Sequence, residues 1–105
     1  MVFDSMTFED LTLHLASFDL SCGGKTVRLN FKEFEVMKLL MAAGQRVVSK
    51  GELIVKVWGY ESGAEDNNVE AYISFLRKKL FYLGSKVEIV VLRKLGYRLL
   101  AQREG

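Results

Sequence analysis

The chain has 105 residues, half of them hydrophobic, and a formal net charge of +2 at pH 7. This length predicts one domain with a core and is too short for two domains of ordinary size. The single cysteine, Cys22, excludes an internal disulfide, and no apolar run approaches the roughly 20 residues of a membrane span. The first residues do not resemble a signal peptide, so we expect a cytoplasmic protein without a membrane partner. We expect residues 1–6 to be a leader or linker remnant, residues 7–101 the folded domain and residues 102–105 a tail.

The first thirty residues alternate between hydrophobic and polar, as short strands do. Leucines stand at every second position at Leu11, Leu13 and Leu15, and Gly23-Gly24 separates two further apolar positions. Glycine tolerates the positive φ that two-residue hairpin turns require. We therefore predict a small antiparallel meander over residues 7–29.

A first helix is predicted to begin after Asn30. Asn30 can cap it, and Glu33 three residues later completes a capping-box pattern. Apolar residues then recur at helical spacing until Gly44, which can end the helix.

A second helix is predicted between Ser49 and Gly59. Ser49 and Glu52 repeat the capping signal, with each side chain able to bond the backbone of the other. Residues 46–48, between the two helices, are short and β-branched and predict a brief strand. Glycine, serine and acidic residues predict a loop over residues 59–67.

Residues 66–83 predict a third helix with one apolar and one polar face, capped by Asp66 or Asn67. When the residues are spaced by about 100 degrees, six side chains lie within about 60 degrees of one direction: Val69, Tyr72, Ile73, Leu76, Leu80 and Leu83. That face is expected to pack. The opposite face carries Asn67, Ala71, Ser74 and Lys78, flanked by Phe75 and Tyr82, with Arg77 and Lys79 at its shoulders.

The last two apolar runs surround Arg93-Lys94-Leu95-Gly96 and predict a β-hairpin with a basic tip. Positive charge is concentrated in this part of the chain. Residues 66–98 hold seven basic and three acidic residues, whereas residues 1–65 hold seven basic and nine acidic ones. Such asymmetry suggests a polyanion partner, and an ordinary solvated face is the other interpretation.

The predicted order is strands, helix, short strand, helix, helix and hairpin. Two helices, the second with a basic outer face, followed by a basic hairpin form the arrangement of a winged helix, a helix-turn-helix variant. In order and spacing, several runs resemble the effector domain of OmpR/PhoB-type response regulators. These runs are Leu29-Asn30-Phe31-Lys32-Glu33-Phe34, Gly44-Gln45-Arg46-Val47-Val48-Ser49-Lys50, Leu53, Val57-Trp58-Gly59, Val69-Glu70-Ala71-Tyr72-Ile73-Ser74, Leu76-Arg77-Lys78-Lys79-Leu80 and Gly96-Tyr97-Arg98-Leu99.

The resemblance covers about residues 7–100 and implies an α+β fold. This fold is a winged helix-turn-helix with an N-terminal four-stranded antiparallel sheet, three helices and a C-terminal β-hairpin wing. It implies sequence-specific binding of double-stranded DNA, with the third helix in the major groove and the wing in the minor groove. Family members usually bind direct repeats as tandem protomers and carry a phosphorylated receiver domain. No receiver is present here, so we expect either a separated effector domain or a stand-alone relative.

The resemblance and the polar face together give the candidate contacts. For DNA these are Asn67, Asn68, Ala71, Tyr72, Ser74, Phe75, Lys78, Arg93 and Lys94, and for the phosphate backbone Trp58, Arg77 and Tyr97. The loop with Glu61 and Glu65 matches one that touches RNA polymerase in some activators.

Each candidate also has a plainer interpretation. Asn67 can serve as a helix cap, Ser74 and Lys78 can simply be solvated, and Tyr72 can pack with its hydroxyl directed outward. Core packing explains Trp58 and Tyr97 equally well, and the acidic loop can be merely solvated.

Two positions depart from the family pattern. Phe75 stands where family members often have a basic or polar residue, and a phenyl ring cannot bond a phosphate, although it can touch a thymine methyl. Lys94 replaces the usual glycine after the wing arginine, which adds charge to the turn.

Two other functional classes are alternatives to DNA binding: an enzyme and a protein-contact module. An enzyme has little support, because His14 is the only histidine and no metal-ligand spacing or phosphate-binding glycine loop occurs; we expect no catalytic residue, metal or cofactor. A winged helix used for protein contact is favoured by the aromatic residues Phe75, Phe81 and Tyr82. Salt dependence separates the two binding modes, since phosphate contacts weaken steeply with salt.

Overall fold

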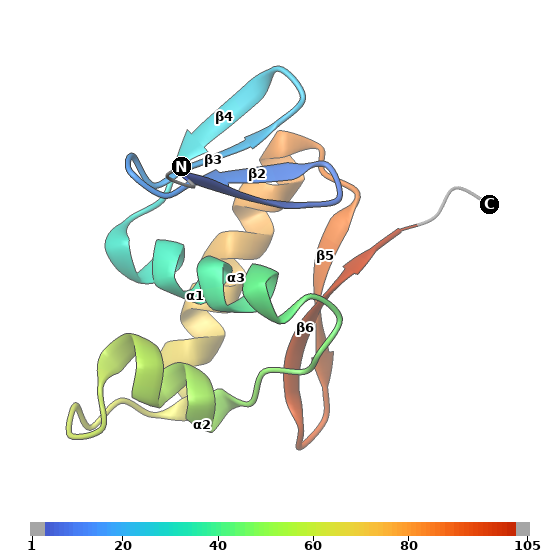
Figure 1. The fold of residues 1–105 in the computed structure, drawn as a ribbon. Helices are drawn as coiled ribbons and strands as arrows, with labels where there is room; N and C mark the ends of the chain where they lie inside the picture. The colour runs from blue at the N-terminus through green and yellow to red at the C-terminus, as the bar shows by residue number, and fades with distance from the viewer. Residues whose placement is uncertain (1–3, 103–105) are drawn as a thin grey trace.

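The computed structural model describes residues 4–102, and these form the predicted α+β winged helix (Figure 1). Four strands pair antiparallel in chain order: β1 (Ser5–Phe8), β2 (Leu11–His14), β3 (Asp19–Cys22) and β4 (Lys25–Arg28). The helical part consists of α1 (Phe31–Ala43), α2 (Lys50–Leu53), the π-helical turn η1 (Ile54–Trp58) and α3 (Asp66–Leu83). The hairpin of β5 (Val87–Leu92) and β6 (Gly96–Ala101) completes the fold as the wing.

The sheet starts earlier than the expected domain boundary at residue 7. Ser5 pairs with His14 and Met6 with Leu13, so two residues of the expected leader belong to β1. At the other end, the backbone N–H of Gln102 donates to the carbonyl of Lys86 at 2.7 Å, which continues the hairpin by one residue into the expected tail. Residues 1–3 and 103–105 of those two segments lie outside the described residues.

The core lies between the inner face of the four-stranded sheet, α1, the apolar face of α3 and the wing. Five of the six predicted inward residues of α3 are buried, and the sixth, Tyr72, is half-buried at the edge. The buried core includes Leu11, Leu13, Leu20, Phe34, Met37, Leu40, Val69, Ile73, Leu76, Leu80, Leu83, Ile89 and Leu99. This burial fixes which side of α3 remains free.

The second helix is shorter than expected. Ser49 caps it as predicted, accepting the N–H of Glu52 at 3.0 Å, but the Glu52 carboxylate pairs with Lys56 and Arg46 instead of bonding back. After Leu53 the chain widens into η1, and the N–H of Gly59 donates to the carbonyl of Ile54 at 2.9 Å. The sequence pattern is the same for one π-helical turn as for one α-helical turn, so it did not distinguish them.

The cap of α3 lies one residue before the earlier of the two predicted positions. The N-cap is Glu65, neither Asp66 nor Asn67, and its backbone N–H donates to Asn68 Oδ1 at 2.8 Å. The amide of Asn68 therefore serves the helix end, and Asn67 is left exposed on the surface.

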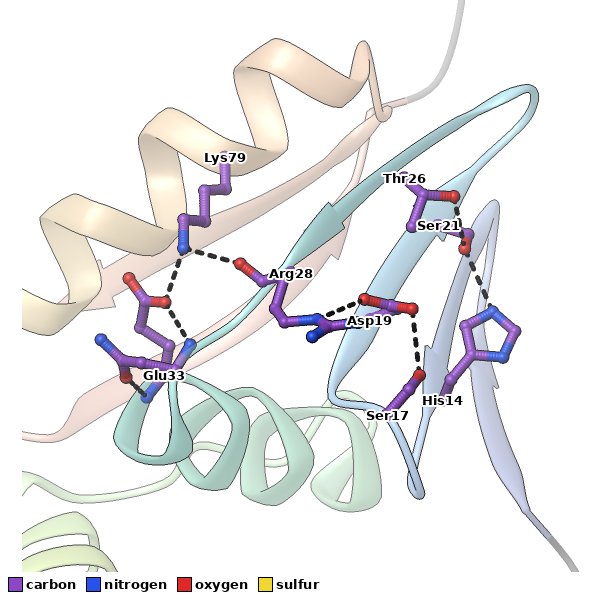
Figure 2. Close-up of polar contacts among 9 residues, drawn as sticks. His14, Ser17, Asp19, Ser21, Thr26, Arg28, Glu33 and Lys79 are labelled. Carbon is purple, nitrogen blue, oxygen red and sulfur yellow. Dashed lines mark hydrogen bonds and ion pairs between the residues drawn. The ribbon is translucent and has the colours of Figure 1, made fainter.

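A buried carboxylate joins the sheet, α1 and α3. Glu33 is 3% exposed, accepts the N–H of Asn30 at 2.8 Å in the predicted capping box, and pairs with Lys79 Nζ at 2.6 Å. The same ammonium donates to the carbonyl of Arg28 at the end of β4, at 3.1 Å. Figure 2 shows Lys79 reaching from α3 to both acceptors. A charge this deeply buried is tolerated because it is paired and hydrogen-bonded.

Lys79→Met should lower the free energy of unfolding by about 2–3 kcal/mol, because it leaves the Glu33 carboxylate buried without its cation. Lys78→Met is the matched control, since this neighbouring ammonium is exposed and has no hydrogen-bond partner within residues 4–102; it should change stability by about 0.5 kcal/mol or less. Urea denaturation measures both. Equal effects of the two substitutions would contradict the account.

The predicted brief strand at residues 46–48 is a single bridge to the wing. Val48 and Tyr97 exchange backbone hydrogen bonds of 2.8 and 2.9 Å. Gly96 sits beneath this bridge with φ +145°, and a Cβ there would lie 2.1 Å from the carbonyl oxygen of Val48. Only glycine lets the two backbones approach this closely.

Gly96→Ala should lower the free energy of unfolding by more than about 2 kcal/mol, because the added methyl collides with rigid backbone. Gly24→Ala, at a turn where an added Cβ meets no atom within 4 Å, is the control and should stay within about 0.5 kcal/mol of wild type. Thermal or urea unfolding gives the comparison, and a mild effect at Gly96 would show that the bridge is not rigid.

Candidate nucleic-acid interface

Three separate segments meet at the end of the molecule opposite the four-stranded sheet. In Figure 1, α2, the start of α3 and the tip of the wing all lie at the lower end, far from β1–β4. A groove of about 460 Å³ runs between them, lined by Ser49, Lys50, Gly51, Asp66 and residues 91–96. The first turn of α3 and the wing tip therefore form one continuous surface.

The outer face of α3 is open to solvent, as predicted. Asn67, Ala71, Ser74 and Lys78 are all exposed, and none of their side chains has a hydrogen-bond or ion-pair partner within residues 4–102. These residues recur every three or four positions and so form one row along the helix. The row offers an amide, a methyl, a hydroxyl and an ammonium to a partner.

The two shoulder cations of this face, Arg77 and Lys79, form hydrogen bonds within the protein. Arg77 donates from Nε and Nη2 to the carbonyl of Ile89, at 3.0 and 2.8 Å, and thereby ties α3 to β5. Lys79 is held by Glu33 on the opposite side of the helix. These bonds give Arg77 a positioning role, but the residue is exposed and a guanidinium has five donors, so its contact with phosphate stays a prediction.

Trp58, Tyr72 and Phe75 form a row of rings beside the outer face. The Tyr72 ring meets Trp58 edge-on with centroids 5.4 Å apart, and meets Phe75 edge-on at 5.3 Å. Lys32 Nζ lies 5.6 Å from the centre of the Trp58 ring. Phe75 ends the row and is 43% exposed, whereas Tyr72 and Trp58 are half-buried. Lys32 was not predicted as a neighbour of this surface, because only the fold brings α1 beside η1.

Tyr97 is part of the core, being 3% exposed, and its burial raises the pKa of the phenol.

Lys50 lines the groove, with its Nζ 3.4 Å from Glu70 Oε2 and 4.0 Å from Asp66 Oδ2. Burial disfavours the ammonium, but Tyr97 and these carboxylates outweigh it and raise the pKa of Lys50. Sequence reasoning missed Lys50, whose only signal was its place at the first position of a capped helix.

The wing turn presents Arg93, Lys94 and Leu95, all exposed. Lys94 has φ +66°, the left-handed conformation that glycine adopts most readily, and the N–H of Leu95 donates to the carbonyl of Leu92 at 2.9 Å. The turn therefore keeps a glycine-like geometry while carrying a second cation at its tip.

The loop between η1 and α3 carries the predicted acids on the surface. Glu61 and Glu65 are exposed, and Glu65 also begins α3. Beside them, Tyr60 is almost fully exposed. Contact of this loop with a polymerase stays a prediction.

Known proteins with similar sequences establish the family. The family model described as "Transcriptional regulatory protein, C terminal" matches residues 24–99. The chain belongs to this family. Over 90 residues it is 38% identical to the transcriptional regulatory protein DltR of Streptococcus agalactiae, a match that covers 86% of this chain and 40% of DltR. The chain thus spans less than half the length of that relative.

Solved structures agree with the family assignment. The C-terminal domain of the nisin resistance regulator NsrR, a lantibiotic response regulator, is 32% identical with a TM-score of 0.76, and the match covers 90% of this chain and 94% of that domain. The Klebsiella pneumoniae RstA DNA-binding domain, solved in complex with the RstA box, is 25% identical with a TM-score of 0.75, covering 91% and 96%. The resemblance to OmpR/PhoB-type response regulators and the winged-helix fold are confirmed.

Other kinds of site find no support in the described part of the chain. Within residues 4–102, no helix is both long and apolar enough to cross a membrane. The same residues contain no cluster of three histidine, cysteine, aspartate or glutamate side chains that could hold a metal ion. His14 lies half-buried in β2, with Nε2 3.1 Å from the hydroxyl of Ser21 (Figure 2). The matched family is one of transcriptional regulators and not of enzymes.

The wing turn gives a direct test of local strain. Lys94→Gly should be more stable than Lys94→Ala by about 1 kcal/mol, because both remove the charge but only alanine keeps the steric penalty at φ +66°. Denaturation midpoints of the two variants measure the difference. Identical midpoints would mean that the turn relaxes out of the left-handed conformation.

Proposed function

We propose that this chain binds double-stranded DNA sequence-specifically, as the effector domain of a two-component transcription regulator. In this proposal α3 enters the major groove and the wing tip reaches the adjacent minor groove. Family membership supports the assignment, and the RstA domain, which was solved with its DNA box, is a relative at 25% identity.

The observation that carries the proposal is the position of the unpaired cations. Lys78 on α3 and Arg93 and Lys94 on the wing are exposed, and none of the three has an ion-pair partner within residues 4–102. In contrast, the other two cations of α3 are engaged within the protein, Arg77 by the carbonyl of Ile89 and Lys79 by Glu33. Unpaired cations on a helix and on the neighbouring hairpin suit phosphates on the two sides of a groove.

The candidate contact residues fall into groups according to the chemistry of their side chains. Asn67, Asn68, Ser74 and the aromatic and methyl groups of α3 face the expected major groove, although Asn68 shares its amide with the helix end. Arg93 suits a narrow minor groove, whose negative potential attracts guanidinium groups. In this proposal Trp58 donates its indole N–H to phosphate, whereas Tyr97 and Arg77 act mainly by holding the wing against the helices.

One domain with few cations should bind weakly, so we propose that two copies bind a direct-repeat operator together. A receiver domain elsewhere in a longer protein would control this pairing. The exposed acids Glu61 and Glu65 are the proposed contact for a basic surface of RNA polymerase.

A protein-contact module is the second candidate function. Its strongest support is a groove of about 540 Å³ between α3 and β5, lined in part by Phe81, which is 88% exposed, and Val91. This groove adjoins the C-terminal end of the row of Asn67, Ala71, Ser74 and Lys78, because Phe81 follows Ser74 by seven residues and so lies on nearly the same side of α3. Tyr82 is also exposed, but the ammonium of Lys25 covers its ring at 5.2 Å.

Lys78→Ala and Arg93→Ala should each weaken DNA binding and reduce the slope of log affinity against log salt by about 1, because each removes one phosphate or groove contact. Lys25→Ala is the matched control, since it removes one cation from the β3–β4 turn at the opposite end of the molecule. Fluorescence anisotropy across a salt series measures all four proteins. Unchanged affinity and slope in both interface variants would refute the proposed surface.

A further inference from the structure

We infer that α3 selects thymine in the major groove through an apolar patch of Phe75 and Ala71, which reads the 5-methyl group. This inference rests on the proposed function and assigns the base class that the face prefers. It concerns the part of the helix surface that cannot make hydrogen bonds.

The phenyl ring of Phe75 is partly exposed, although contact between an apolar ring and water is unfavourable. It is 43% exposed and ends the row of three rings. Ala71 lies one helical turn before it, is exposed and carries only a methyl group. Residues four apart are neighbours on a helix, so the two side chains form one apolar strip beside the polar groups of Asn67, Ser74 and Lys78.

The ring is held in place before any ligand arrives. Its edge-to-face contact with Tyr72 at 5.3 Å is continued by the contact of Tyr72 with Trp58 at 5.4 Å. The Trp58 ring lies under the ammonium of Lys32. Aromatic pairs of this geometry stabilise each other beyond simple burial, and a fixed side chain loses less conformational entropy on binding.

Only one group in the major groove matches an apolar strip. The edges of guanine, adenine and cytosine present hydrogen-bond acceptors or donors there, and only thymine adds a methyl group. A phenyl ring that covers an acceptor or donor without replacing its water bonds incurs a desolvation cost. The strip therefore gains from thymine and disfavours the other bases at the same position.

Ala71 makes this contact sterically possible. A long side chain one turn before Phe75 would hold the helix away from the base edges, whereas a methyl group allows close approach and can itself contact a thymine methyl. The strip is thus long enough to contact one or two neighbouring thymines.

The test uses operator duplexes recovered by the purified protein from a randomised pool. Each thymine is replaced in turn by deoxyuridine, which removes the methyl group and leaves base pairing intact. Wild-type protein should lose about fourfold in affinity at one or two positions, the loss expected for one buried methyl group. Phe75→Ala should bind more weakly and lose this sensitivity, whereas Phe75→Leu should retain it.

Phe81→Ala is the matched control, because it removes an exposed ring from the same helix that lies outside the strip of Ala71 and Phe75, about 120 degrees from Phe75 around the helix; it should keep wild-type methyl sensitivity. Tight, salt-sensitive binding without any dependence on thymine methyl groups would overturn this inference and leave the proposed function standing. Failure to recover any duplex would overturn both. Loss of methyl sensitivity in Phe81→Ala would assign the reading to the C-terminal end of α3 and would also overturn the inference.

Discussion

The pairing of the buried Glu33 carboxylate with Lys79 is the contact on which the position of α3 depends. Glu33 closes the first turn of α1, and Lys79 joins it to α3 while also bonding the end of β4. A carboxylate that is 3% exposed needs such partners, because burying an unpaired charge is costly. The sheet, α1 and α3 therefore meet at one point with little freedom to shift.

The three consecutive cations of α3 have different partners because the helix directs their side chains to different sides. Arg77 binds the carbonyl of Ile89 on the wing side and Lys79 binds Glu33 on the α1 side. Lys78 lies between them in sequence, so it points away from both contacts and toward solvent. The pair that orients the helix thus also determines which cation is offered to DNA, and the wing is oriented by the same helix.

The main features of the fold could be predicted from the sequence because they rest on local rules. The capping box of Asn30 and Glu33, the Gly23-Gly24 turn and the apolar face of α3 follow from residue type and spacing. The predicted cap of α3 was wrong by one or two residues, since acids and amides at positions 65–68 all have capping chemistry. The π-helical turn was missed for the reason that one turn contains too little periodicity.

The location of the candidate site could be predicted from the sequence, but the role of each residue in it could not. A basic residue on a helix shoulder can reach solvent or a neighbouring carbonyl, and no local pattern shows that Ile89 accepts from Arg77. Lys50 was missed because its groove forms only when α2, α3 and the wing come together. The left-handed Lys94 shows that a turn can keep its geometry when its usual glycine is replaced.

The central claim is that α3 and the wing read a DNA sequence. Selection of duplexes from a randomised pool by the purified protein, at two salt concentrations, tests it most directly. The account predicts a recurring short motif, arranged as a direct repeat, with affinity that falls steeply as salt rises. Absence of any enriched motif, together with binding that does not respond to salt, would contradict it and favour a protein partner.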